Sequence, residues 1–181
     1  MIMSAAARKL VLTSHVVSSV GWLGGVAVFL ALAVVGLASQ DFQTVRAVYL
    51  VMEPAGWSVL VPLAFASLLT GLVQSLGSVW GLFRHYWVLF KLVINIGAVV
   101  VLLAYMQTLS FLAGVAADTV PSGGDLGQLR TPSVVVHSVL ALLLLLVATV
   151  LAVYKPKGMT PYGWRKQQQR RTKSQPANAL L

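Results

Sequence analysis

Four long, mainly apolar stretches run through the chain, and shorter polar segments separate them. They cover residues 10–38, 57–80, 86–114 and 132–154. Each is long enough to cross a bilayer as an α-helix, which takes about 20 apolar residues. The connection over residues 81–85 is so short that the second and third helices should be antiparallel neighbours. The pattern predicts an all-α, polytopic membrane protein, built as a four-transmembrane-helix antiparallel bundle.

The segment between the first two stretches mixes charged and apolar residues. Asp41, Arg46 and Glu53 stand among apolar residues whose spacing predicts a short amphipathic helix lying in the membrane interface. The alternative is that this segment is the tilted start of the second span. Pro54 and Gly56 punctuate the segment where the second apolar stretch begins.

Composition supports the membrane assignment. Hydrophobic residues make up 58% of the 181 residues and charged residues only 9%, which no water-soluble domain of this size requires. The formal net charge is +9, but seven of the thirteen Lys and Arg residues follow Val153. This placement is typical of the cytoplasmic side of a membrane protein and argues against a nucleic-acid partner. Because there is no cysteine, disulfides, thiolate ligands and thiol catalysis are excluded.

The loop charges predict the orientation. Residues 1–9, 81–85 and 155–181 carry ten Lys and Arg residues and no acid, whereas the other two connections hold all four acids. Both termini should therefore be cytoplasmic in the bacterial cytoplasmic membrane. Residues 155–181 have too little apolar content to fold, so we predict a disordered basic tail that lies against anionic lipid.

The first span carries a polar face that contains glycine. At about 100° per residue, His15, Ser18 and Trp22 share one face, and Gly25 lies close to it. Serine and glycine admit a neighbouring helix or a flat cofactor close to the backbone, and imidazole can bind a metal or move protons. Ordinary helix packing would produce the same pattern, so both interpretations stay open.

A second ionisable group is expected at the depth of His15. Lys91 lies five residues into the third span, as His15 does in the first, so each is roughly 8 Å below the cytoplasmic boundary. Asn95 follows one turn later, and Thr70 and Gln74 approach from the second span. A charged lysine that faces lipid costs about 3 kcal/mol on insertion scales, so Lys91 should point inward. The alternative is snorkelling to the nearby surface.

The other two histidines lie elsewhere. His137 opens the fourth span at the opposite side of the membrane, about 15 Å from His15 in depth, so the two cannot ligate one iron. The alternatives are a single inner haem at His15 and a two-haem bundle that uses His15 inside and His137 outside. His85 is either a second ligand near His15 or an interfacial residue beside Arg84. The expected neighbours of His137 are Gln107, Ser110 and Glu53.

Two short motifs resemble a known group of proteins. His15 is followed seven residues later by Trp22-Leu23-Gly24-Gly25, and Trp87-x3-Lys91-Leu92 opens a later helix. Over roughly residues 9–154 the chain resembles small bacterial membrane proteins that include the HemJ-type protoporphyrinogen oxidases, the membrane part of copper-resistance D proteins and uncharacterised actinobacterial proteins. Resemblance to the HemJ type implies haem binding at His15 and an essential basic residue at Lys91. Those proteins often have a histidine near the end of the lysine-bearing helix, where this chain reads Tyr105-Met106-Gln107.

The leading hypothesis is a membrane protein that binds haem b within the bundle, for electron transfer or for oxidation of a lipophilic substrate. Haem is favoured over a bare metal because Zn and Cu sites take three or four protein ligands, whereas a porphyrin supplies four nitrogens. The alternatives are a structural or assembly subunit and a small transporter, and the candidate protein partners are a second copy of the chain or a membrane redox protein. The predicted metal ligands are His15 and His137, and the predicted cofactor-binding residues are His15, Ser18, Gly21, Trp22, Gly25, Lys91 and Asn95.

Overall fold

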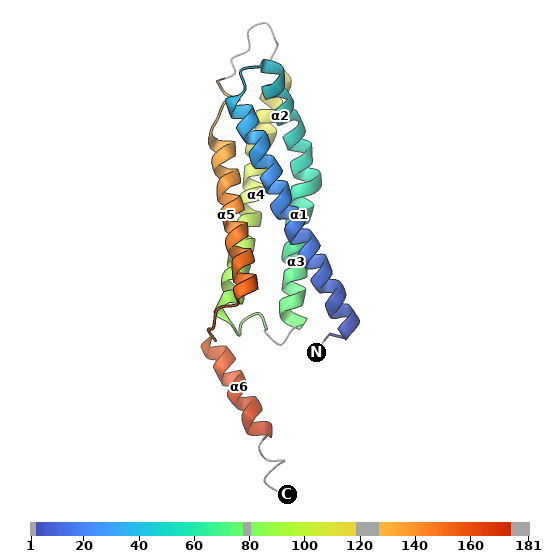
Figure 1. Cartoon of the computed structure of the whole chain (residues 1–181), viewed down its shortest axis with the longest axis vertical. Coiled ribbons are helices and arrows are strands. Elements are labelled where there is room, and N and C mark those ends of the chain that lie inside the picture. Colours follow the sequence, from blue (N-terminus) through green and yellow to red (C-terminus); the bar gives the residue numbers. More distant parts are fainter. Residues whose placement is uncertain (1–2, 78–80, 119–126, 175–181) are drawn as a thin grey trace, which may run out of the picture.

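The chain folds into an elongated bundle of helices (Figure 1). The computed structural model describes residues 3–77, 81–118 and 127–174. The helices are α1 (Ala5–Ala38), α2 (Phe42–Ala55), the π-helix η1 (Gly56–Leu60), α3 (Val61–Gly77), α4 (Tyr86–Asp118), α5 (Ser133–Tyr154) and α6 (Pro161–Ser174). Four segments are long and apolar enough to cross a membrane, namely Ala5–Ala38, Phe42–Gly77, Tyr86–Asp118 and Ser133–Tyr154. The predicted all-α bundle with four candidate spans is confirmed.

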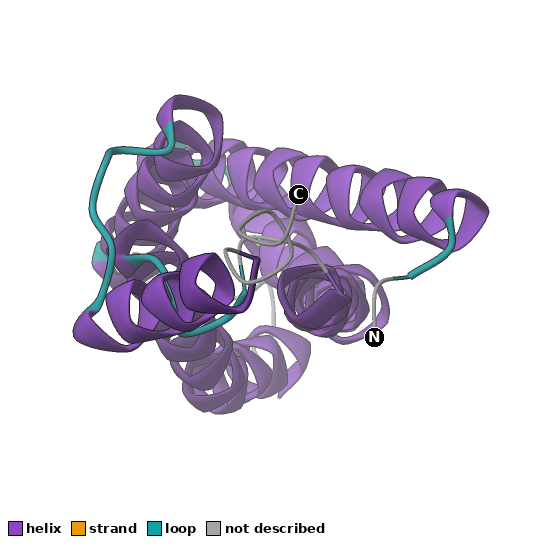
Figure 2. Cartoon of the chain, turned by 90° about the horizontal axis from the view of Figure 1, so that it is seen from below, coloured by secondary structure: helices purple, strands orange, loops and turns teal. Residues whose placement is uncertain are grey.

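The spans form a ring in which α1 and α4 each contact both α3 and α5. Figure 2 shows this arrangement from the end where α1 and α4 begin. We call this the basic end, because it carries Arg84 and Lys155, and the opposite end the acidic end, because Asp41 and Asp118 lie there.

The second span is longer than predicted. Elements α2, η1 and α3 join into one 36-residue apolar stretch, so residues 42–55 are the start of this span, which was the alternative expectation, and do not form a separate helix in the interface. Pro54 lies inside the helix, where its ring and missing N–H disturb the regular hydrogen bonds. A π-helical turn over Gly56–Leu60 follows, and the Ser58 hydroxyl donates to the Pro54 carbonyl at 2.7 Å. Pro54 therefore does not end the helix.

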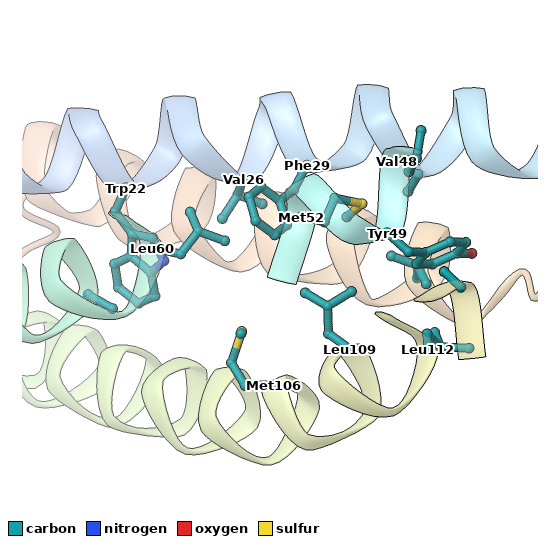
Figure 3. Packing of buried hydrophobic residues seen from close by; sticks show 14 of the residues in the cluster. Trp22, Val26, Phe29, Val48, Tyr49, Met52, Leu60, Met106, Leu109 and Leu112 are labelled. Atoms are coloured by element: carbon teal, nitrogen blue, oxygen red, sulfur yellow. The ribbon is translucent and has the colours of Figure 1, made fainter. Parts of the chain in front are cut away.

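The apolar side chains of α2 face the interior of the bundle and not the membrane interface. Val45, Val48, Tyr49 and Met52 are spaced at helical intervals and are buried against α1 and α4. The Tyr49 hydroxyl donates to the Leu129 carbonyl, which ties α2 to the segment before α5. Figure 3 shows how these side chains continue the apolar interior that starts at Trp22 and Val26 of α1 (Trp22, Val26, Phe29, Met52, Tyr49, Met106, Leu109 and Leu112).

The tail contains a helix where disorder was predicted. Pro161–Ser174 form α6, which leaves the basic end of the bundle (Figure 1). Thr160 caps it, since its hydroxyl accepts from the Gly163 amide at 3.1 Å, and Pro161 occupies the first turn where a missing N–H costs nothing. The prediction of disorder is therefore wrong for residues 161–174. Residues 175–181, and residues 78–80 of the predicted second span, lie outside the described residues.

Candidate functional site

His15 of α1 is held by hydrogen bonds to α3. Its Nδ1 atom lies 3.1 Å from the Ser67 carbonyl oxygen and 3.2 Å from the Thr70 hydroxyl oxygen. A carbonyl only accepts, and the Thr70 hydroxyl already donates to the Ala66 carbonyl at 2.5 Å, so the hydrogen must be on Nδ1. The neutral imidazole therefore keeps its lone pair on Nε2.

Lys91 of α4 meets this lone pair. Its Nζ atom lies 3.4 Å from His15 Nε2, and an ammonium can only donate. The prediction that these residues share a layer is confirmed, and the side chain points into the bundle. Asn95 is different, because its side-chain amide donates to the Lys91 backbone carbonyl at 2.7 Å, one turn back on the same helix. Asn95 thus lies one turn from Lys91, and its side chain bonds the helix backbone.

The charge of Lys91 has no acidic partner in the part of the chain that the structure describes. Asp41 bonds Thr44, and Glu53 accepts from Ser110 at 3.1 Å on the acidic-end side of the bundle. Among the described residues, the side chain within hydrogen-bond distance of the Lys91 ammonium is the His15 imidazole. A cation inside an apolar bundle is stable when an anion or several hydrogen bonds offset its desolvation. The His15–Lys91 pair is therefore a candidate anion-binding site.

Three residues of α3 form a socket for the His15 ring. Ser67, Thr70 and Gly71 lie at i, i+3 and i+4, and a Cβ added at Gly71 would be 2.9 Å from His15 Cε1. The ring therefore lies directly against the α3 backbone. Ser67 also bonds Ser19 of α1, with 2.7 Å between the hydroxyl oxygens. Sequence reasoning found Thr70 but missed Ser67 and Gly71, although their i+3 and i+4 spacing to it was a usable signal.

The glycine face of α1 packs on the second span. A Cβ at Gly21 would lie 3.4 Å from Leu63, and one at Gly25 would lie 2.6 Å from Leu60 Cδ2. Figure 3 shows Leu60 beside the buried Trp22, on the same side of α1. The glycines thus face the bundle, but leucine side chains occupy the space beside them. The Ser18 hydroxyl donates to the Ser14 carbonyl of its own helix at 2.8 Å. Cofactor binding by Ser18, Gly21, Trp22 and Gly25 stays a prediction.

His137 lies in a separate cluster nearer the acidic end. Its Nδ1 atom is 2.8 Å from the Ser133 carbonyl oxygen, and its ring stacks on Tyr105 with 4.2 Å between the centroids. The expected neighbours differ, since Ser110 bonds Glu53 and Gln107 is exposed. The third histidine, His85, pairs its backbone with Met159 in an antiparallel bridge.

Neither His137 nor His85 belongs to a ready metal site. Among the described residues, no group of three or more His, Cys, Asp or Glu side chains could hold a metal ion. Metal ligation by His15 and His137 stays a prediction, in which the other ligands must come from a porphyrin.

The fold and the four apolar helices define the class, an α-helical multi-pass membrane protein. No family model, no curated protein and no solved structure matches the chain.

Proposed function

We propose that this chain is a bacterial cytoplasmic-membrane protein that binds haem b beside His15, for electron transfer or for oxidation of a lipophilic substrate. The supporting observation is the arrangement of the His15–Lys91 pair. His15 bonds the Ser67 carbonyl through Nδ1, and its Nε2 lone pair points to an ammonium with no carboxylate partner among the described residues.

The chemistry of these two side chains suits an iron porphyrin. A ligating histidine almost always donates its other ring N–H to a carbonyl, a carboxylate or water, which sets the tautomer and orients the ring. His15 already has that bond, so Nε2 is the nitrogen available for ligation. Haem, when bound, supplies a redox-active iron whose properties depend on the axial ligand. The Nε2 lone pair can accept a hydrogen bond from Lys91 or bind iron, but not both at once. If haem were bound, the Lys91 ammonium would therefore turn away from Nε2 and could pair with a propionate.

The apolar interior supports a redox role over transport. Between the His15–Lys91 pair and the acidic end, the bundle is filled by buried side chains such as Trp22, Val26, Phe29 and Met106. A transport pathway needs polar groups or water at these depths. A redox cofactor benefits from apolar walls, because they exclude water from the iron.

A structural or assembly subunit is the second candidate. Leu60 and Leu63 close the glycine face of α1, and Ser19 and Ser67 join α1 to α3. Small residues and interhelical hydrogen bonds of this kind hold membrane helices together without any cofactor. In this case the His15–Lys91 pair would have only a packing role.

Absorption spectroscopy separates the two candidates. The protein is expressed with ample haem, purified in detergent and compared with His15→Ala and with His137→Ala as the matched control. We expect haem bands in the wild type and in the control, and their loss in His15→Ala. Lys91→Ala should retain less haem than Lys91→Arg, because arginine keeps the charge that would pair with a propionate.

Two results would overturn the proposal. A colourless wild-type protein would remove haem and favour the assembly subunit. Bands that persist in His15→Ala would place the ligand at another residue.

A further inference from the structure

The segment after α5 folds back onto the turn before α4. The Gly158 carbonyl accepts from the Tyr86 amide at 3.4 Å, and the Thr160 amide donates to the Arg84 carbonyl at 3.0 Å. The buried Thr160 hydroxyl donates to the Phe83 carbonyl at 2.6 Å. We call residues 158–164 the clasp. These bonds place the clasp level with the first residue of α4.

Gly163 is essential to this contact. A Cβ at this position would lie 2.5 Å from the Arg84 carbonyl oxygen and 3.2 Å from the carbonyl carbon. Both atoms belong to the backbone, so they cannot move aside as the end of a flexible side chain could. Only glycine therefore allows α6 to begin this close to the turn.

The clasp presents aromatic side chains at the expected depth of the lipid head groups. Tyr162 and Trp164 are 51% and 56% exposed. Tyr86 at the start of α4 and Tyr154 at the end of α5 are also exposed. Tyrosine and tryptophan are enriched at membrane–water interfaces, where the ring meets apolar chains and the polar tip meets water.

The same surface is basic. Arg165 and Lys166 are exposed, and the Lys166 ammonium donates to the Tyr162 hydroxyl at 3.0 Å, which holds the two side chains together. The described acids lie away from the clasp. Asp41 directly precedes α2, Glu53 is in α2 and Asp118 ends α4. Positive charge beside interfacial aromatics complements an anionic lipid surface.

We propose that the clasp holds Tyr162, Trp164, Arg165 and Lys166 as a preformed binding surface for the head groups of anionic phospholipids. This differs from attraction of a free basic tail, because binding depends on the folded clasp as well as on charge. The far end of α6 contributes less. The helix leads away from the bundle for about 21 Å (Figure 1), whereas salt screens charges beyond about 8 Å.

Quenching of Trp164 fluorescence by brominated lipids tests which lipid lies beside the clasp. The proportions of the two lipids stay the same throughout, and only the lipid that carries bromine changes. The full-length protein is placed in nanodiscs of phosphatidylcholine with a minority of phosphatidylglycerol, and bromine is carried by one lipid or by the other. Subtracting the signal of Trp164→Phe isolates the Trp164 fluorescence. We expect brominated phosphatidylglycerol to quench Trp164 several-fold more, per molecule, and the excess to shrink as salt rises.

Two glycine variants separate the clasp from charge alone. Gly163→Ala changes no charge but meets the Arg84 carbonyl, so it should abolish the excess quenching. Gly158→Ala is the matched control, because its Cβ would meet only Tyr86 Cδ2 at 3.7 Å, and it should behave as the wild type. If Gly163→Ala reduces the overall helix content, Thr160→Val tests the clasp by removing its hydroxyl bonds instead.

The outcomes are distinct. Equal quenching by both lipids in the wild type would overturn anionic-lipid binding. An excess that persists in Gly163→Ala and Thr160→Val would overturn the clasp and favour a free basic tail. None of these measurements depends on haem.

Discussion

Gly71→Ala should displace the His15 ring from its socket. The added Cβ would lie 2.9 Å from His15 Cε1 and 3.3 Å from Nδ1, whereas ordinary contacts begin near 3.4 Å. The ring must therefore move by several tenths of an ångström. Its bonds to the Ser67 carbonyl and the Thr70 hydroxyl, at 3.1 Å and 3.2 Å, are already near the upper limit for a good hydrogen bond. This movement should break one or both of them.

The size of the effect follows from these two bonds. Each is worth about 0.5–1.5 kcal/mol net, and interhelical bonds in membranes average about 0.6 kcal/mol. The loss is therefore about 0.5–1.5 kcal/mol if one bond breaks and about 1–3 kcal/mol if both break. Alanine also stabilises a helix interior by up to about 1 kcal/mol relative to glycine, which opposes the loss. A matched control must remove this second effect.

Gly97→Ala supplies that control. Gly97 is also in the interior of a spanning helix, and a Cβ there would meet nothing within 4 Å. Unfolding both variants in mixed micelles, followed by circular dichroism, should show Gly71→Ala to be less stable than Gly97→Ala by about 0.5–3 kcal/mol. Nitrogen NMR of the imidazole in the haem-free protein should show the Nδ1–H tautomer in the control and its loss in Gly71→Ala. Equal stability and an unchanged tautomer would refute the socket.

Three further predictions concern packing, pH and topology. Gly25→Ala should lower the unfolding temperature in micelles because its Cβ meets Leu60, whereas Gly24→Ala, with open space around it, should not. Hydrogen bonds from the hydroxyl and then the amide of Thr44 lower the pKa of Asp41, so this carboxylate stabilises the fold at neutral pH. That contribution should disappear as the pH falls below the ordinary aspartate range, and thermal unfolding of Asp41→Ala should lack this component. A reporter fused after residue 181 should be active only in its cytoplasmic form, and periplasmic activity would reverse the orientation.

The four spans could be predicted because crossing a membrane depends mainly on the length and apolarity of a stretch, which are local properties. Two features depend on non-local contacts. The helix continues past Pro54 into a π-helical turn that packs on Met106, so Pro54 does not mark the start of the second span. The start of α6 depends on Thr160 and Gly163, which are held by a turn more than 70 residues earlier in the chain. Apolar content alone carries no information about such contacts.

The equal depth of His15 and Lys91 could be counted from the sequence, because position along a helix advances by about 1.5 Å per residue. The groups that these two side chains face could not be found in this way. The rotation of each helix and its choice of neighbour follow from side-chain packing, which brought Ser67 and Gly71 to the His15 ring and set its tautomer. Packing likewise placed Leu60 and Leu63 where the sequence suggested a cofactor surface. The same glycine pattern permits a cofactor or a leucine side chain as the neighbour, because glycine only allows another group to approach the backbone closely.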